Sequence, residues 1–364
     1  MMQNRYVGIL VCDTNGRPPF QDQEFYRELA AFGNKAGLSV FIFSPAWVSW
    51  KLKKTWGYRF DSERGEWVLG KFPLPALIYD RSFYKYRRHL LQKRQFMKNI
   101  RSLRLSRLLG HSVGNKWEMQ LILARSPDFR PFLPKTTLYR SPESLFKWLK
   151  KYKNAFLKPL SGCQGRGVFH MMETSAGTFR IRGRDSANRP IQFDVDHISG
   201  IKDRITPYLK QRKYLIQPAL SLQTKSGLPY DVRALVQKNG RGVWCTTGIA
   251  VRLGRPGSVT ANLHGGGIAL KAEPFLRREF GETLSRHLLE RIQRLCKTLP
   301  PYLEQYYGRM AELGLDFGVD QSGKVWILEV NSKPGRAAFS GSQAIRNAAI
   351  RQPLFYAKYL LERP

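Results

Sequence analysis

Residues 314–335 constrain the fold of this chain more than any other stretch. They read GLDFGVDQSGKVWILEVNSKPG, in which an alternating apolar segment, a polar turn and a β-branched apolar run follow one another. This order predicts two antiparallel strands joined by a turn at residues 320–323. Glu329 and Asn331 are two positions apart and therefore share one face of the second strand, and pairing across the turn brings Asp316 close to that face.

The side chains of Asp316, Glu329 and Asn331 carry hard oxygen atoms. Such oxygens suit Mg²⁺, which keeps several waters and binds few protein carboxylates alongside substrate phosphates. An ordinary hairpin with its acids facing solvent is equally compatible with these residues, because acidic residues are common near turns. The metal-site interpretation therefore depends on a phosphate site elsewhere in the chain.

The bulk composition is that of a globular protein. The 364 residues suffice for two or three domains, and 42% are hydrophobic. No window approaches the roughly 20 apolar residues of a membrane-spanning helix, and the N-terminus does not read as a secretory signal, so we expect a cytoplasmic protein. The four cysteines show no metal-ligand spacing, which is typical of buried thiols in a reducing compartment: Cys12, Cys163, Cys245 and Cys296.

The charge is strongly basic, with 61 Lys and Arg against 27 Asp and Glu, a formal net charge of +34. Such a charge attracts polyanions. Residues 81–117 contain 11 Lys and Arg and no acid, and Arg94, Lys98 and Arg101 follow helical spacing. Two interpretations are open, a solvated helix face and a docking surface for an anionic polymer. No base-reading module is visible, so any nucleic-acid binding is expected to be independent of sequence.

The first part of the chain predicts a small α/β domain. Strand patterns at residues 5–13 and 38–45 flank a helical pattern at residues 21–35, and this β–α–β order favours parallel strands. A hairpin at residues 56–72 and a strand at residues 75–82 follow. No GxGxxG follows the first strand, which argues against a dinucleotide site there.

A glycine-rich segment follows a lysine-bearing strand at residues 155–169, AFLKPLSGCQGRGVF. Glycines such as Gly162, Gly165 and Gly167 let backbone amides approach phosphates closely, and Lys158 adds a point charge. No Gly-Lys-Ser/Thr and no helix follow, so this is not a P-loop. A plain hairpin turn explains the glycines equally well in isolation.

Polar residues recur on the strand patterns that follow. Gln217 precedes a proline that interrupts a strand, and Asp231 and Arg233 share one face of the next. Arg252 lies on a further strand, and Asn262 lies in a glycine-rich loop. Each residue alone fits a surface ion pair or a turn. Their order, from the lysine and glycine loop to the Asp…Glu-x-Asn hairpin, is informative as a whole.

This order resembles the ATP-grasp fold, and its details resemble the YheC/YheD family of endospore coat-associated proteins. The motifs that carry the resemblance lie at residues 76–81 (ALIYDR), 114–119 (GNKWEM), 156–168, 214–222, 230–237, 260–267 and 315–335. The resemblance implies an α/β fold with α+β subdomains and a Rossmann-like N-terminal domain. The expected division is an N-terminal domain at 1–110, a first ATP-grasp subdomain with a glycine-rich lid at 111–225, and a C-terminal subdomain with the metal site at 226–364.

The resemblance also implies ATP and Mg²⁺ as cofactors and assigns roles by motif. It assigns nucleotide contacts to Lys116, Lys158, Gly162, Gly165, Gly167, Gln217 and Asp231, metal binding to Asp316, Glu329 and Asn331, and stabilisation of the transferred phosphoryl group or the acceptor to Arg233, Arg252 and Asn262. One departure concerns the hinge, where ATP-grasp proteins often carry an acidic residue for the ribose. The sequence here is Gln-Pro-Ala-Leu from Gln217, so the ribose contact has no assigned residue.

The commonest ATP-grasp chemistry converts a carboxylate into an acylphosphate, which an amine or thiol then attacks. The resemblance therefore implies a ligase that acts on an unidentified carboxylate and amine of a spore or cell-envelope component. Two alternatives stay open, a non-catalytic structural protein that contacts spore-coat proteins and a basic protein that binds anionic polymers. The expected locations are the cytoplasm and the spore coat.

Overall fold

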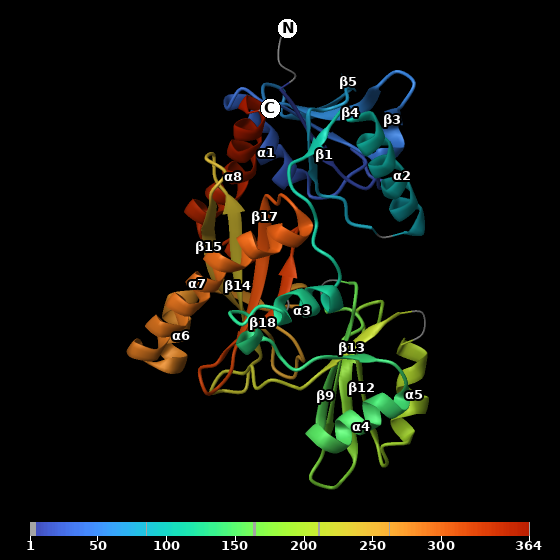
Figure 1. The fold of residues 1–364 in the computed structure, drawn as a ribbon, viewed down its shortest axis with the longest axis vertical. Coiled ribbons are helices and arrows are strands. Elements are labelled where there is room, and N and C mark those ends of the chain that lie inside the picture. The colour runs from blue at the N-terminus through green and yellow to red at the C-terminus, as the bar shows by residue number, and fades with distance from the viewer. Residues whose placement is uncertain (1–4, 85, 163–164, 210–211, 262, 364) are drawn as a thin grey trace.

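Three β-sheets build the molecule. The structure, a computed structural model, describes residues 5–84, 86–162, 165–209, 212–261 and 263–363. The sheets have seven, six and five strands and follow one another in chain order. Figure 1 shows the seven-stranded sheet at one end of the long axis, the six-stranded sheet at the other and the five-stranded sheet between them.

The N-terminal sheet has the strand order β3-β4-β2-β1-β6-β7, with β5 beside β4. Its strands are β1 (Tyr6–Leu10), β2 (Ser39–Phe43), β3 (Val48–Ser49), β4 (Lys54–Asp61), β5 (Glu66–Pro73), β6 (Leu77–Asp80) and β7 (Arg107–Leu108). Strand β1 pairs in parallel with both β2 and β6, which confirms the predicted parallel arrangement. Helix α1 (Gln23–Lys35) and helix α2 (Arg87–Leu103) contribute to different core clusters on this sheet.

The six-stranded sheet, called the lid sheet below, has the order β12-β11-β10-β9-β13-β8 with antiparallel pairing. Its strands are β8 (Thr137–Tyr139), β9 (Asn154–Pro159), β10 (Phe169–Glu173), β11 (Phe179–Arg184), β12 (Pro190–Val195) and β13 (Tyr214–Gln217). Helix α4 (Pro142–Tyr152) and helix α5 (Gly200–Leu209) pack on one face. Ala155 and Leu157 point into that core, so Phe156 and Lys158 occupy the opposite face of β9.

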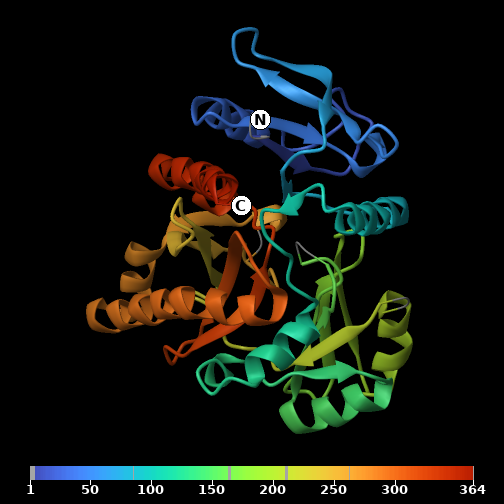
Figure 2. The same ribbon diagram turned by 45° about the horizontal axis from the view of Figure 1, so that its top comes forward.

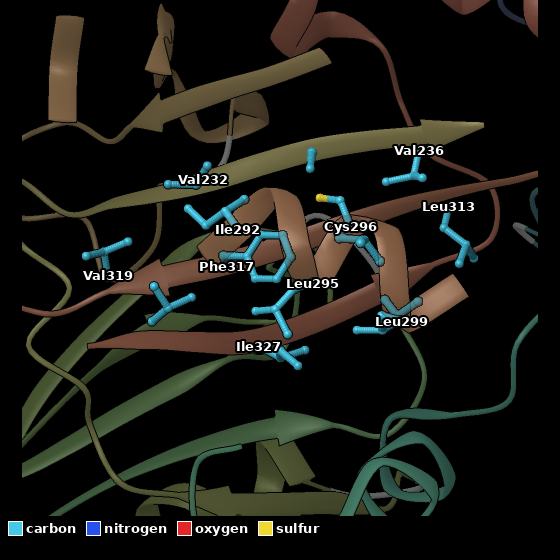
Figure 3. Packing of buried hydrophobic residues seen from close by; sticks show 14 of the residues in the cluster. Val232, Val236, Ile292, Leu295, Cys296, Leu299, Leu313, Phe317, Val319 and Ile327 are labelled. Atoms are coloured by element: carbon cyan, nitrogen blue, oxygen red, sulfur yellow. The ribbon is translucent and has the colours of Figure 1, made fainter. Parts of the chain in front are cut away.

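The C-terminal sheet has the order β16-β15-β14-β17-β18. Its strands are β14 (Tyr230–Lys238), β15 (Trp244–Leu253), β16 (Ile268–Lys271), β17 (Glu312–Val319) and β18 (Val325–Asn331). Helix α7 (Glu282–Tyr307) covers one face, and Figure 3 shows its side chains packed over Phe317 and Ile327. The remaining elements are α3 (Lys116–Ala124), α6 (Ala272–Phe280), α8 (Gln343–Glu362) and the 3₁₀ turns η1 (Pro45–Trp47), η2 (Arg130–Phe132), η3 (Leu263–Gly265) and η4 (Ala337–Phe339).

Helix α8 returns to the N-terminal sheet. Its buried residues Leu354, Tyr356 and Leu360 share a core cluster with Leu29 of α1, and Figures 1 and 2 show α8 in red beside the blue N-terminal elements. The first and last helices therefore stabilise one another. Among the residues that the structure describes, no helix is long and apolar enough to cross a membrane.

A buried ion cluster joins the N-terminal sheet to the C-terminal sheet. Its centre is Glu312, which is 3% exposed. One carboxylate oxygen accepts hydrogen bonds from the hydroxyl of Tyr79 at 2.5 Å and from Arg81 at 3.1 Å. The other oxygen accepts from Gln237 at 3.0 Å and from Arg336 at 2.6 Å. One carboxylate therefore connects β6, β14, β17 and the loop after β18.

We predict that Glu312→Ala destabilises the protein by about 3–5 kcal/mol, because it leaves two buried guanidinium groups without their counterion. The measurement is the denaturant dependence of unfolding. Glu290→Ala is the matched control, since Glu290 is exposed on α7. A stability change for Glu312→Ala no larger than that of the control would contradict the structural role of the cluster.

Candidate nucleotide and metal site

Ion pairs between directly opposite strand positions line the face of the C-terminal sheet that α7 does not cover. Arg233 on β14 lies opposite Asp316 on β17, and Asp231 lies opposite Arg252 on β15. Arg233 donates to both oxygens of Asp316, through Nε and, at 2.9 Å, through Nη2. Arg252 donates to the two oxygens of Asp231 at 2.6 and 2.8 Å, and its Nη2 lies 3.0 Å from Asp316 Oδ2. Four buried charges thus form one closed cluster.

The environments of the two acids drive their pKa values in opposite directions. Burial raises the pKa of Asp231 in spite of its bond to Arg252. Burial also opposes ionisation of Asp316, but Arg233 and Arg252 together outweigh it and hold the pKa of Asp316 below its ordinary value. Asp316 therefore stays ionised because two guanidinium groups face it.

A β-bulge turns Glu329 toward this face. Asp316 lies opposite Glu329, yet Phe317 lies opposite Ile327, so one extra residue is inserted into β18 between them. Val325 and Ile327 point into the core beneath α7, and without the bulge Glu329 and Asn331 would point there too. The predicted hairpin and its pairing of Asp316 with Glu329 are confirmed.

Helix α3 begins with a lysine that contacts both the glycine-rich loop and the hairpin of β17 and β18. Asn115 caps the helix by accepting from the backbone amides of Trp117 and Glu118 at 3.0 and 3.1 Å, and this places Lys116 at the first helical position. The ammonium of Lys116 lies 3.0 Å from Glu329 Oε1 and donates to the carbonyl of Gly162 at 3.2 Å. One lysine thus contacts both parts of the candidate site.

Lys158 faces the same region from the lid sheet. Its ammonium lies 5.4 Å from the ring centroid of Phe156 and makes no hydrogen bond or ion pair within the described part of the chain. Burial lowers the pKa of Lys158 to about 8, since it outweighs the attraction of Glu329, and the nearby charge of Lys116 lowers it further. A half-buried cation that no described acid neutralises suits an anionic ligand.

The glycine-rich loop needs glycine for its backbone conformation. Gly162, Gly165 and Gly167 have φ values of 145°, 72° and 74°, which side chains rarely allow. The amide of Gly167 donates to the carbonyls of Arg184 and Asp185 at 3.0 and 3.2 Å, so this end of the loop is fixed on the lid sheet. Residues 163–164 between these glycines lie outside the described residues.

Gln217 is the last residue of β13 and is buried. Its side-chain amide donates to Thr136 Oγ1 at 2.9 Å, so the lid sheet engages this side chain. Asn262, the last of the predicted site residues, lies outside the described residues. Seven predicted residues do come together around one region: Lys116, Lys158, Asp231, Arg233, Arg252, Asp316 and Glu329.

Sequence reasoning missed three features of this region. It did not predict that two arginines bind Asp316. It did not predict that Phe156 stacks on His170 with ring centroids 5.2 Å apart; burial and, secondarily, the charge of Arg182 lower the pKa of His170 to about 4, so this ring is neutral near pH 7. It also missed Lys333, although the position of Lys333 two residues after Asn331 was a usable signal.

The oxygen ligands for a metal fit in part. Among the described residues, no group of three His, Cys, Asp or Glu side chains could hold a metal ion. Both oxygens of Asp316 already accept from arginines, whereas Lys116 contacts one oxygen of Glu329. The side-chain amide of Asn331 makes no hydrogen bond within the described chain. Among the three predicted ligands, Glu329 keeps one oxygen free of Lys116 and both oxygens of Asp316 are engaged, so Glu329 and Asn331 fit Mg²⁺ better than Asp316 does.

The architecture is that of an ATP-grasp fold, as predicted from the sequence. D-cycloserine synthetase DcsG superposes with a TM-score of 0.56 at 13% identity, covering 98% of this chain and 99% of that one. Residues 106–360 match the family model described as YheC/D like ATP-grasp, and the chain belongs to this family. Membership implies ATP binding.

Two relatives from Bacillus subtilis (strain 168) extend this similarity. Endospore coat-associated protein YheC is 29% identical over 318 residues, which cover 86% of this chain and 86% of that protein. Endospore coat-associated protein YheD is 28% identical over 353 residues, which cover 95% of this chain and 76% of that protein.

We predict that Glu329→Gln lowers the pKa of Lys158 further, because the carboxylate that favours its charged form is removed. Lys116→Met should raise the same pKa, because a neighbouring positive charge is lost. Lysine-labelled protein titrated by heteronuclear NMR measures both shifts, and Lys158→Arg identifies the resonance. A shift of the Lys158 pKa in the same direction in both variants would contradict this arrangement of charges.

Proposed function

We propose that this protein is an ATP- and Mg²⁺-dependent ligase that activates a carboxylate as an acylphosphate and transfers the acyl group to an amine or thiol. The observation that carries the proposal is the position of Lys158, a half-buried cation that forms no ion pair with any described residue, in the electrostatic field of Glu329, Lys116, Asp231 and Asp316. The phosphates of ATP would supply a negatively charged partner for this lysine.

The nucleotide lies between the lid sheet and the C-terminal sheet in this proposal. Lys158 and Lys116 bind phosphate oxygens, and the backbone amides of the glycine-rich loop cover them. The side chain of Gln217 is hydrogen-bonded to Thr136, which leaves the backbone of Gln217 to contact the base. The stacked pair of Phe156 and His170 lies on the same sheet and supplies a flat apolar surface for the base or ribose.

Glu329 and Asn331 are the residues that would hold Mg²⁺. When bound, Mg²⁺ neutralises charge on the phosphates and polarises the transferred group. Lys116, which pairs with Glu329, would also be within reach of phosphate oxygens. Asp316 serves chiefly to fix Arg233 and Arg252, and it joins the metal only if a guanidinium group leaves it.

Arg233 and Arg252 stabilise the negative charge of phosphoryl transfer. Because Asp231 and Asp316 hold their guanidinium planes, little reorganisation is needed at the moment of reaction. Asn262 is proposed to orient the acceptor. A carboxylate oxygen attacks the γ-phosphorus and ADP leaves; the amine nitrogen or thiol sulfur then attacks the acyl carbon, loses a proton and displaces inorganic phosphate.

The test of this function combines binding and turnover. Calorimetry should detect Mg²⁺-dependent binding of ADP, and Glu329→Ala should weaken it by at least about tenfold, or 1.4 kcal/mol. The exposed Glu290→Ala is the matched control. Incubation with ATP, Mg²⁺ and pooled carboxylates and amines should release ADP; silence with every acceptor class would count against a ligase.

A structural role in the spore coat is the second candidate. The observation that favours it is the set of internal ion pairs, since Asp316 and Glu329 are already neutralised by Arg233, Arg252 and Lys116. The curated relatives are named as coat-associated, which supports the same location for this chain. Mg²⁺-dependent ADP binding that disappears in Glu329→Ala would reject a purely structural role.

We also predict a pH dependence of nucleotide affinity. Protonated Lys158 attracts phosphate and neutral Lys158 does not, so affinity is retained below the pKa of about 8 and falls as the pH rises through it. The fall should reach at most about tenfold per pH unit. Lys158→Arg keeps its charge and should show no such fall in calorimetric titrations with ADP and Mg²⁺. Parallel profiles for the two proteins would exclude Lys158 as the titrating group.

A further inference from the structure

The exposed side of the α2 segment is rich in basic side chains. The exposed side chains on or directly after this helix, called the α2 face below, are Arg87, Arg88, Arg94, Lys98, Arg101 and Arg104. Among the described residues, none of these six forms an ion pair with an acid. The sequence from 81 to 117 offers no Asp or Glu as a local partner.

This arrangement costs helix stability. Arg87 and Arg88 begin the helix at the positive end of its dipole, and the first turn contains no acid. Arg94 and Lys98 are four residues apart, where like charges repel. The helix is held instead by its buried side, where Phe96 packs in the core of the N-terminal sheet. Within the described fold Arg88 contacts Tyr86 and His89, but no acid neutralises any of the six charges, so an external anion is their natural partner.

The α2 face begins next to the candidate site. Arg81 donates to the carbonyl of Pro334 at 3.2 Å, and Lys333 donates to the carbonyl of Ser82 at 2.8 Å. The ammonium of Lys333 also lies 5.5 Å from the ring centroid of Tyr84. Asn331, the proposed metal ligand, is two residues before Lys333. The segment that leads into α2 thus contacts the loop that leaves the metal strand, and Figure 1 shows this end of α2 directed toward the other two sheets.

We propose that the α2 face docks an acidic polypeptide segment and that this segment supplies the carboxylate for ligation. The identity of the partner rests on the proposed function, because a carboxylate acceptor and an anionic docking partner are then one molecule. Five of the six basic residues are arginines, whose planar forks match carboxylates in bidentate pairs. Exposed Phe83 and Tyr84 beside the helix contribute apolar contact for the peptide.

The length of the helix sets the length of the peptide. Helix α2 contains 17 residues and is therefore about 25 Å long. An extended peptide spans about 3.3 Å per residue, so about eight residues cover the surface. Affinity should therefore rise with peptide length up to about eight residues and then level off.

The experiment measures fluorescence anisotropy of labelled α-linked oligo-L-glutamates of four, eight and twelve residues, without nucleotide. The variant is Arg94→Glu with Arg101→Glu on the α2 face. The control is Arg291→Glu with Arg294→Glu, the same charge change on exposed positions of α7. The α2 variant should bind the eight-residue peptide about tenfold more weakly, because two ion pairs with the peptide are lost. The control should follow the wild type, apart from the weak effect of net charge.

Several outcomes would overturn the docking proposal. Equal losses in the two variants would show that net charge alone attracts the peptide. Tighter, α2-dependent binding of an eight-nucleotide single strand would assign the face to nucleic acid. Unchanged circular dichroism and unchanged ADP binding show that the α2 variant is folded. If it misfolds, the variant Arg94→Gln with Arg101→Gln takes its place in the same experiment.

The same samples separate docking from catalysis. Peptide binding that depends on the α2 face, without ADP release from ATP, supports docking and rejects the ligase. ADP release with small carboxylates and amines, without α2-dependent peptide binding, supports the ligase and overturns docking.

Discussion

The ion pairs that join β14, β15 and β17 are the interaction on which the candidate site depends. Each pair occupies directly opposite positions of an antiparallel ladder, so the backbone register alone brings Arg233 to Asp316 and Arg252 to Asp231. A single buried acid would take up a proton or destabilise the sheet. Because each carboxylate faces a guanidinium group, the sheet retains charged side chains on the face opposite α7 and still closes an apolar core on the other.

The bulge in β18 adds the acidic part of the site to this arrangement. Regular alternation would direct Glu329 toward the core that Ile327 and Val325 occupy. The extra residue shifts the alternation of side chains in β18 by one position. Val330 therefore points into the core, and Glu329 points to the opposite face, where it contacts Lys116. A local irregularity of the ladder thus directs an acidic side chain of a core strand toward the candidate site, where bulges are often found in other proteins.

The sequence predicts local secondary structure well, but it predicts contacts between segments that are distant in the chain less well. The hairpin of β17 and β18 and the parallel opening of the N-terminal sheet follow from periodicity and turn residues, which act over a few positions. The pairing of Arg252 with Asp316 joins residues on strands that are not neighbours in the chain, and no spacing rule reports it. The same holds for α8, whose packing on α1 joins the two ends of the chain.

The strength of attachment differs between the two sheets that flank the C-terminal sheet. The N-terminal sheet is joined through Arg81 and Glu312, whose side chains are 4% and 2% exposed. The lid sheet side is joined through Lys116 and Glu329, whose side chains are 20% and 28% exposed and therefore more screened by water. The more exposed ion pair of Lys116 and Glu329 is therefore expected to contribute less to stability than hydrogen bonds to a buried charge.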